Sequence, residues 1–180
     1  MKQNSEYVIL VDENDHPTGS EEKLKAHQDG LCHRAFSVFV FYMAEKEIEI
    51  LLQQRQFGKY HSGGLWTNAC CSHPKPDEDT ILAGERRLFE ELGIQIKLKD
   101  VGGFHYIAKF ENGLTENEMD HVLIGFSQNK TVDINPQEVN AVVWMPISEL
   151  LQDLIDHPKK YTAWFAPALE IALMNLQEVK

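Results

Sequence analysis

Cysteine, basic charge and long apolar runs are scarce in this chain of 180 residues. Its three cysteines are an odd number, so we expect reduced thiols rather than a disulfide framework. The 17 basic against 28 acidic residues give a formal net charge of -11. We therefore expect no nucleic-acid partner and no membrane partner, since both bind clustered Lys and Arg. No run approaches the roughly 20 apolar residues that span a bilayer, and no signal-type segment follows Met1, which predicts a cytoplasmic protein.

The composition that remains is typical of a globular protein. Hydrophobic residues make up 43% of the chain and charged residues 25%. A chain of this length can bury a core without disulfides or a structural metal, and it contains no internal repeat or low-complexity linker. We expect one domain over residues 1–180.

Periodicity and turn residues predict a mixture of strands and helices. Strands are predicted at residues 7–11, 35–42, 48–54, 65–71, 101–110, 121–127 and 141–145. Ser20 is expected to cap a short helix that ends near His27, and Gly93 to end a longer helix at residues 79–92. The apolar stripe of the longer helix is expected at Ile81, Leu82, Leu88, Phe89 and Leu92. Two more helices are predicted at residues 147–156 and 161–176. This order favours an α/β or α+β fold, a mixed β-sheet sandwiched between helices.

One run stands out for its chemistry, Thr-Asn-Ala-Cys-Cys-Ser-His-Pro at residues 67–74. It places two of the three cysteines next to a histidine and just ahead of a segment dense in carboxylates. A thiol two residues from an imidazole is a candidate acid/base pair. The run therefore points first to catalysis.

Histidines and carboxylates in three separate segments could converge on one metal ion. Glu116 and Glu118 are two residues apart, so in an extended strand both would project from the same face. Together with imidazoles they would suit Mn²⁺, Zn²⁺ or Fe²⁺ better than Mg²⁺. Taken alone, each histidine is more often a surface or hydrogen-bonded residue than a metal ligand, by roughly four to one. The candidate ligands are His27, His33, His73, Glu116 and Glu118.

The helix at residues 79–92 carries Arg86 and Arg87 four residues before Glu90 and Glu91. Such pairs can simply support a solvated helix. The arginine doublet beside two carboxylates, just before Gly93, instead favours a diphosphate site in which carboxylate holds a divalent cation. Loop cations that could join it, or remain solvated, are Lys23, Arg55 and Lys59. Trp164 is either a core aromatic or a π face for a cationic intermediate.

With these residues in view, the chain resembles the type 1 isopentenyl diphosphate isomerases of the Nudix superfamily. The matching blocks are residues 23–27 with 33–37, residues 66–74, and residues 116–118 with 120–122. Residues 78–94 look like a degraded Nudix box, G-x5-E-x7-R-E-U-x-E-E-x-G-U, where U is aliphatic. Ser72 stands in place of its first glycine and Arg87 in place of the glutamate of REUxEE. Losing that glutamate weakens the Mg²⁺ cluster of the hydrolases, and the added positive charge suits an intact diphosphate.

The resemblance implies roles for the candidate residues. His27, His33, His73, Glu116 and Glu118 would bind one divalent metal, Mn²⁺ or Zn²⁺. Glu91 would hold Mg²⁺ against the substrate diphosphate. The cations that would neutralise this diphosphate are Lys23, Arg55, Lys59 and Arg87. Cys71 matches the family's cysteine, and Cys70 would be a structural neighbour.

The implied reaction moves a double bond by adding one proton and removing another, from isopentenyl to dimethylallyl diphosphate. Metal-bound Glu118, assisted by Tyr106, would protonate the alkene, and Trp164 would face the carbocation. The Cys71 thiolate, its pKa lowered by metal-bound His73 and bound cations, would remove a proton from the opposite face. No flavin is expected, because no electrons are transferred. The partner would be a small allylic or homoallylic diphosphate, and the protein a monomer or weak homodimer. The alternatives are a Nudix diphosphate hydrolase and a non-catalytic Nudix-fold binding module.

Overall fold

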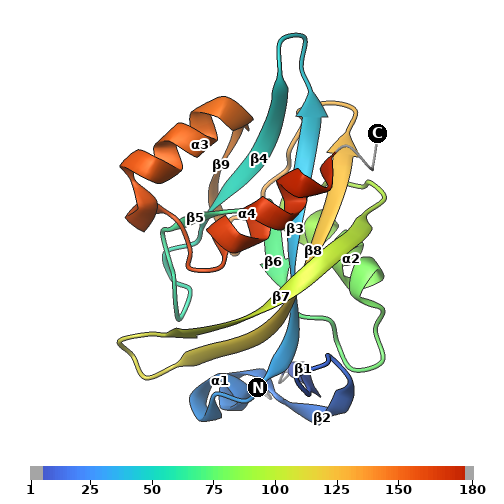
Figure 1. Cartoon of the computed structure of the whole chain (residues 1–180), viewed down its shortest axis with the longest axis vertical. Helices are drawn as coiled ribbons and strands as arrows, with labels where there is room; N and C mark the ends of the chain where they lie inside the picture. Colours follow the sequence, from blue (N-terminus) through green and yellow to red (C-terminus); the bar gives the residue numbers. More distant parts are fainter. Residues whose placement is uncertain (1–5, 177–180) are drawn as a thin grey trace.

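The computed structural model describes residues 6–176 and shows a mixed sheet with helices on both faces (Figure 1). The N-terminal half contains β1 (Tyr7–Val11), β2 (Pro17–Glu22), α1 (Lys23–Asp29), β3 (His33–Met43), β4 (Ile48–Arg55), β5 (Trp66–Thr67) and β6 (Cys70–Ser72). The C-terminal half contains α2 (Thr80–Leu92), β7 (Lys99–Lys109), β8 (Thr115–Ser127), β9 (Val139–Pro146), α3 (Ile147–Asp156), the 3₁₀ turn η1 (Pro158–Lys160) and α4 (Phe165–Met174). Within residues 6–176, no helix is long and apolar enough to cross a bilayer.

Strand β3 is the centre of the sheet. Its run of β-branched and aromatic residues is buried on both faces, as expected of a central strand. It pairs in parallel with β8, and antiparallel with β1, β4 and β6. Strand β7 continues the sheet beyond β8, and β9 continues it beyond β4. Glu118 of β8 is therefore held between β3 and β7, while Glu116, two residues earlier in β8, is paired with β7.

Alternate residues of β3 serve two separate cores. Phe36 and Val38 pack with Leu88 and other residues of α2 on one face. Phe39 packs on the opposite face with Phe165 of α4, in a core that also includes Leu150 of α3. The mixed sheet between helices that the sequence predicts is thus confirmed.

Helix α2 begins and ends as predicted, but its apolar face is different. Asp79 accepts hydrogen bonds from the backbone N–H groups of residues 81 and 82, and Gly93 closes the helix with a φ of 66°. Leu82 and Phe89 are 57% and 52% exposed, so their place in the apolar stripe was wrong. The helix presents a neighbouring face to the sheet, because Gly84 lets the helix approach closely: a Cβ there would lie 2.5 Å from Leu123 Cδ1. The buried residues are Ala83, Gly84, Leu88, Glu91 and Leu92.

The N-terminal segment also differs from the prediction. Residues 17–22 form strand β2 against β1, and the helix begins only at Lys23. Glu22 rather than Ser20 is the cap, with its carboxylate accepting from Lys25 N at 3.0 Å. Pairing with β1 outweighs the local capping preference of Ser20, and Pro17 is tolerated because it is the first residue of an edge strand.

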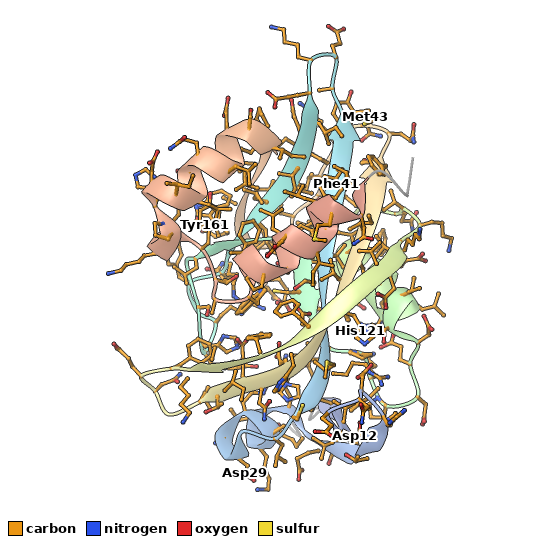
Figure 2. All side chains as sticks on the ribbon, in the orientation of Figure 1. Asp12, Asp29, Phe41, Met43, His121 and Tyr161 are labelled. Atoms are coloured by element: carbon orange, nitrogen blue, oxygen red, sulfur yellow. The ribbon has the colours of Figure 1, made fainter. Side chains whose placement is uncertain are left out.

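A half-buried histidine, His121, joins the β1–β2 turn to β7; Figure 2 labels it on β8, above Asp12 of that turn. His121 Nδ1 lies 2.7 Å from Asp100 Oδ2, and His121 Nε2 lies 2.8 Å from Asp15 Oδ2. Arg34 Nε donates to the other oxygen of Asp15 at 2.9 Å. The hydrogen bond to Asp100, with that to Asp15, outweighs burial and raises the pKa of His121. The imidazolium therefore holds the turn in place.

We predict that His121→Gln lowers the free energy of unfolding by about 1 kcal/mol near pH 6. Because the folded pKa is raised, this contribution is full below the unfolded pKa of about 6.5 and is lost as the pH rises through the folded pKa. Urea denaturation of both proteins from pH 5.5 to 9 measures it. A gap that widens above pH 7 would contradict the assignment.

Candidate active site

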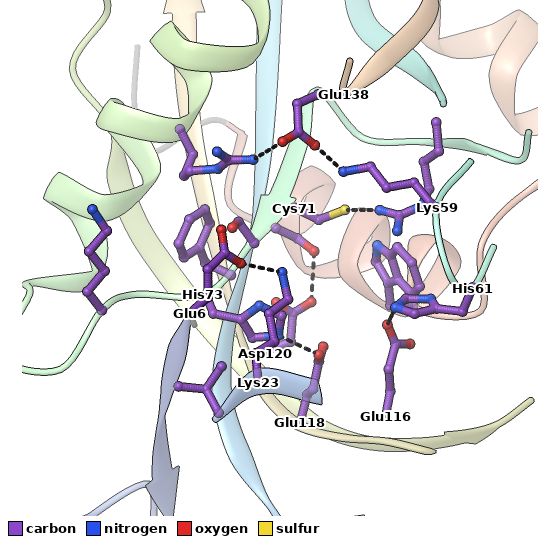
Figure 3. Close-up of a pocket in the computed structure, with 18 of the residues that line it drawn as sticks. Glu6, Lys23, Lys59, His61, Cys71, His73, Glu116, Glu118, Asp120 and Glu138 are labelled. Atoms are coloured by element: carbon purple, nitrogen blue, oxygen red, sulfur yellow. Dashed lines mark hydrogen bonds and ion pairs between the residues drawn. The ribbon is translucent and has the colours of Figure 1, made fainter. Parts of the chain in front are cut away.

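Predicted site residues from both halves of the chain line one cavity of about 550 Å³ (Figure 3). This volume lies in the range usual for small-molecule sites. Its walls come from β3, β6, β8, the polar face of α2 and the loop after β4. Trp164, at the start of α4, also lines it.

Four of the five predicted ligands of the His/Glu metal site converge beside this cavity. One ligand atom each from His27, His33, His73 and Glu118 lies within 4.8 Å of all the others. Glu118 Oε1 is 2.9 Å from His73 Nε2, 3.3 Å from His33 Nε2 and 3.9 Å from His27 Nε2. They come from α1, β3, β8 and the segment after β6, which the β3–β8 pairing brings together.

Backbone contacts orient two of these imidazoles for a cation. The Nδ1 of His27 lies 2.7 Å from Lys23 O, and the Nδ1 of His33 lies 2.8 Å from Leu31 O. Each Nδ1 therefore carries the proton, and each Nε2 keeps a lone pair. Both Nε2 atoms are buried and have no hydrogen-bond partner among residues 6–176. Burial also lowers the pKa of His27 and brings that of His73 to about 3, so the rings stay neutral. These are the properties of a metal site, and the four residues fit one divalent ion.

The two carboxylates of β8 share a tyrosine. Tyr106 lies opposite Glu118 in the β7–β8 ladder, and its hydroxyl is 2.5 Å from Glu118 Oε2 and 3.1 Å from Glu116 Oε2. Burial and the charge of Glu118 raise the pKa of Glu116 well above its usual value. Burial opposes ionisation of Glu118 too, but its contacts with His33 and His73 outweigh burial and lower its pKa. The site therefore favours a proton on Glu116 and a negative charge on Glu118.

Glu116 lies with a histidine that the sequence analysis did not single out. His61 Nε2 is 3.2 Å from Glu116 Oε1, and ligand atoms of His27, His61 and Glu116 lie within 4.8 Å of one another. His61 follows Lys59 by two residues, in the loop after β4. Its proximity to a predicted diphosphate cation was the one available signal.

The adjacent cysteines point to opposite faces of β6. Cys70 is fully buried in the core under α2, whereas Cys71 lines the cavity. Arg55 Nη1 donates to Cys71 Sγ at 3.2 Å. Burial raises the pKa of the Cys71 thiol to about 12, and Arg55 offsets this only in part. The lowering of this pKa that we expected from bound cations is therefore not produced by the protein's own groups.

Trp164 closes the side of the cavity near Cys71. Its side chain is 3% exposed, and Arg55 Cζ is 5.3 Å from the centroid of its ring. The ring of Tyr106 is 6.4 Å away, centroid to centroid. The four residues predicted to be catalytic, Cys71, Tyr106, Glu118 and Trp164, all line this cavity.

Each lysine predicted to bind diphosphate already has a carboxylate partner. Lys23 Nζ lies 3.0 Å from Glu6 Oε2, and Lys59 is paired with Glu138. Arg87 Nη2 lies 3.4 Å from the second oxygen of Glu138, so this carboxylate joins the two cations (Figure 3). Glu6 and Glu138 were missed because neither belongs to a recognisable motif. The site thus gathers positive charge and balances it internally.

Glu91, the residue expected to hold Mg²⁺, is engaged by the protein. Its side chain accepts from Arg87 Nη2 at 2.6 Å and from Gln53 Nε2 at 3.0 Å. The residue is 4% exposed and does not line the cavity. Binding a cation at Glu91 therefore requires one of these donors to move aside.

Comparisons with known proteins identify the family of this chain. The NUDIX domain family matches residues 32–165. A protein of Aromatoleum aromaticum named isopentenyl-diphosphate Delta-isomerase 2 is 45% identical over 91% of this chain and 84% of its own length. Isopentenyl-diphosphate Delta-isomerase of Photobacterium profundum is 44% identical over 95% of this chain and 96% of its own. The chain belongs to the isopentenyl-diphosphate Delta-isomerase family within the NUDIX domain family.

Solved structures extend the likeness to more distant members. A Deinococcus radiodurans protein superposes with a TM-score of 0.66 at 17% identity, covering 84% of this chain and 90% of its own. A C. elegans Ap4A hydrolase complex has a TM-score of 0.58 at 17% identity, covering 81% of this chain and 98% of its own. At such identities the likeness concerns the fold alone.

We predict that Zn²⁺ or Mn²⁺ stabilises the isomerase-family chain by about 2.7 kcal/mol at a hundredfold excess over the dissociation constant. In His33→Gln the ion should bind at least about tenfold more weakly, which reduces this gain by about 1.4 kcal/mol or more. Denaturation with and without metal measures the gain for each variant. The matched control is His105→Gln, on an exposed residue of β7. Equal metal stabilisation of wild type and His33→Gln would refute the site.

Proposed function

We propose that this chain interconverts isopentenyl and dimethylallyl diphosphate by protonation and deprotonation. The observation that carries the proposal is the meeting of two proton-transfer groups in one cavity. The Cys71 thiol lines it from β6, and the Glu118 carboxylate with the Tyr106 hydroxyl lines it from β8 and β7. Cationic side chains border the same cavity, as a diphosphate requires.

Binding of the diphosphate falls to Lys23, Lys59, Arg55 and Arg87. Substrate phosphate oxygens would replace Glu138 between Lys59 and Arg87, and Glu6 at Lys23. Exchanging one anion for another leaves these partly buried cations paired throughout. The acids therefore hold the cations in position before the substrate arrives.

Protonation of the alkene is the difficult step, because an unactivated double bond is a very poor base. The raised pKa of Glu116 and the lowered pKa of Glu118 favour a proton on Glu116, and the Tyr106 hydroxyl is placed to donate to either carboxylate. That arrangement supplies a proton from the β8 side of the cavity. The alkene π electrons form the new C–H bond, and a tertiary carbocation results.

The carbocation requires a neighbour that stabilises positive charge without reacting. The Trp164 ring offers a π face at the cavity wall. Cys71, as the thiolate that Arg55 and bound cations would stabilise, then takes a proton from the adjacent carbon, and the electrons of that C–H bond form the new double bond. The reverse reaction exchanges the two roles, so donor and acceptor depend on direction.

The imidazole and carboxylate side chains of this site are suited to binding divalent cations. Mn²⁺ or Zn²⁺ would be held by His27, His33, His73 and Glu118, with the fifth predicted ligand, Glu116, on the side of the site near His61. Mg²⁺ would be held by Glu91 with the diphosphate once Arg87 or Gln53 moves aside. Such ions would make a neighbouring acid stronger and neutralise the phosphate oxygens. The proposed reaction transfers protons and no electrons, so it needs no flavin.

The main alternative, a Nudix diphosphate hydrolase, fits the site less well. Arg87 replaces a carboxylate of the hydrolytic motif, and it bonds both Glu90 and Glu91. Its guanidinium occupies these carboxylates and adds positive charge to the cavity wall. Both effects favour holding a diphosphate intact over activating water.

We predict that Cys71→Ala lowers isomerisation at least about 10²-fold, the usual scale of a lost acid/base group, while Cys70→Ala retains most of it. The two residues are adjacent, yet only Cys71 lines the cavity. The assay incubates each protein with isopentenyl diphosphate and Mg²⁺ or Mn²⁺, and follows dimethylallyl diphosphate and released phosphate together.

The same assay separates the alternatives. Phosphate release without isomer would identify a hydrolase, and neither product would identify a binding module. Equal losses in Cys70→Ala and Cys71→Ala would show that Cys71 is not the proton-transfer group. Circular dichroism of both variants checks that Cys70→Ala, which opens a small space in the core, remains folded.

A further inference from the structure

A second set of ligand atoms lies next to the four-residue metal site and shares one member with it. It consists of His27, His61 and Glu116, with ligand atoms within 4.8 Å of one another. All three residues are at least nine-tenths buried. Figure 3 shows His61 beside Glu116, apart from His73 and Glu118. Glu116 belongs to this set and not to the set around Glu118.

The surrounding structure holds His61 firmly against Glu116. Its ring stacks on Phe110, with centroids 4.7 Å apart and planes 20° apart. The neighbouring residue is fixed as well, because Asn112 Nδ2 donates to Tyr60 O at 2.6 Å. Phe110 and Asn112 both lie in the connection between β7 and β8, the strand that carries Glu116. The loop after β4 is therefore attached to the β7–β8 hairpin at this point.

His27 can serve only one ion at a time. Its Nδ1 is committed to Lys23 O at 2.7 Å, which leaves the Nε2 lone pair as its single donor site. That Nε2 is buried and has no hydrogen-bond partner in the described part of the chain. This Nε2 can bind an ion that is also held by Glu118, His33 and His73, or an ion that is also held by His61 and Glu116. The two sets therefore compete for His27.

We propose that His27, His61 and Glu116 form an alternative position for the metal ion, adjacent to the position formed by His27, His33, His73 and Glu118. One ion is exchanged between the two through His27. This inference rests on the metal centre of the proposed function and adds His61 to it. The position takes a divalent transition metal, because two imidazoles and one carboxylate suit Zn²⁺ or Co²⁺ better than Mg²⁺.

A fourth imidazole changes what the centre can do. An ion at the alternative position would lie beside Glu116 instead of Glu118, and both carboxylates contact the Tyr106 hydroxyl. The two positions would thus place positive charge next to one or the other of the carboxylates that contact Tyr106. His61 is a ligand in this scheme and not a catalytic residue.

The test uses Co²⁺ as the probe and variants that remove one set at a time. His33→Gln with His73→Gln disables the four-residue site and leaves the alternative position intact. A triple variant that also carries His61→Gln disables both metal positions. The introduced side-chain amide can still donate a hydrogen bond to the Glu116 carboxylate. His105→Gln is the control for the loss of an exposed imidazole. Calorimetry gives affinity for chelator-treated protein, and the visible Co²⁺ spectrum reports nitrogen ligation.

The double variant should bind one Co²⁺ about 10- to 100-fold more weakly than wild type, on the scale of a perturbed metal site, and the triple variant at least about tenfold more weakly again. Equal binding by the double and triple variants would overturn this inference alone. A wild-type protein that binds no Co²⁺ would overturn the proposed metal centre as well.

Loss of fold is separated from loss of ligand by circular dichroism of each metal-free variant. If the triple variant unfolds, crystals of the double variant with Zn²⁺ decide the matter. An anomalous peak bordered by His27, His61 and Glu116 supports the proposal. A peak at any other place, or none at saturating Zn²⁺, contradicts it.

Discussion

The parallel pairing of β3 with β8 is the interaction on which the rest of this structure depends. The register sets His33 opposite Glu118. It continues as far as Tyr42 opposite Ser127, so it includes the β3 residues that face the two cores. Side chains alternate along a strand, so a slip of one residue would turn Glu116, Glu118 and Asp120 away from the cavity. Ser37 Oγ donates to Asp120 Oδ2 at 2.8 Å, a buried contact that favours the observed register. Fold and site are thus specified by the same ladder.

The site concentrates groups that a stable core would avoid. Neutral imidazoles and two carboxylates are buried together, and burial of such groups costs free energy unless each finds a partner. Partners are supplied within the site by Tyr106, His33 and His73, but some imidazole nitrogens remain unpaired within residues 6–176. The cost is offset by the two large hydrophobic cores on either side of the sheet. A bound cation would provide a partner for these unpaired imidazole nitrogens.

Local signals allowed the sequence to predict much of the fold. Asp79 and Gly93 mark the ends of α2, and the apolar runs of β3 and β4 mark their hairpin. The prediction failed where tertiary contacts decide. The polar first half of β8 was not assigned as strand, because its alternation serves the cavity rather than a core. Leu88 and Leu92 are buried as predicted, but Leu82 and Phe89 were wrongly placed inside, where Ala83 and Gly84 complete the buried face.

The sequence likewise predicted those parts of the candidate site that lie in a local motif, and it missed those that only the fold brings together. Cys71 and His73 lie in one short motif, and the spacing of Glu116 and Glu118 indicates a shared face. Nothing local connects His61 to Glu116, because their contact depends on the β7–β8 hairpin folding against the loop after β4. Glu138 is likewise recognisable only once Lys59 and Arg87 lie beside it. Long-range charge balance leaves no pattern in a single sequence.

The central claim is that separate groups of this cavity add one proton and remove another while the diphosphate stays intact. Turnover of isopentenyl diphosphate in D₂O, followed by NMR, tests it most directly. The account predicts deuterium in a methyl group of dimethylallyl diphosphate, because the acid exchanges with solvent between turnovers, with no phosphate released. Dimethylallyl diphosphate that contains no deuterium, or hydrolysis in place of isomerisation, would contradict it.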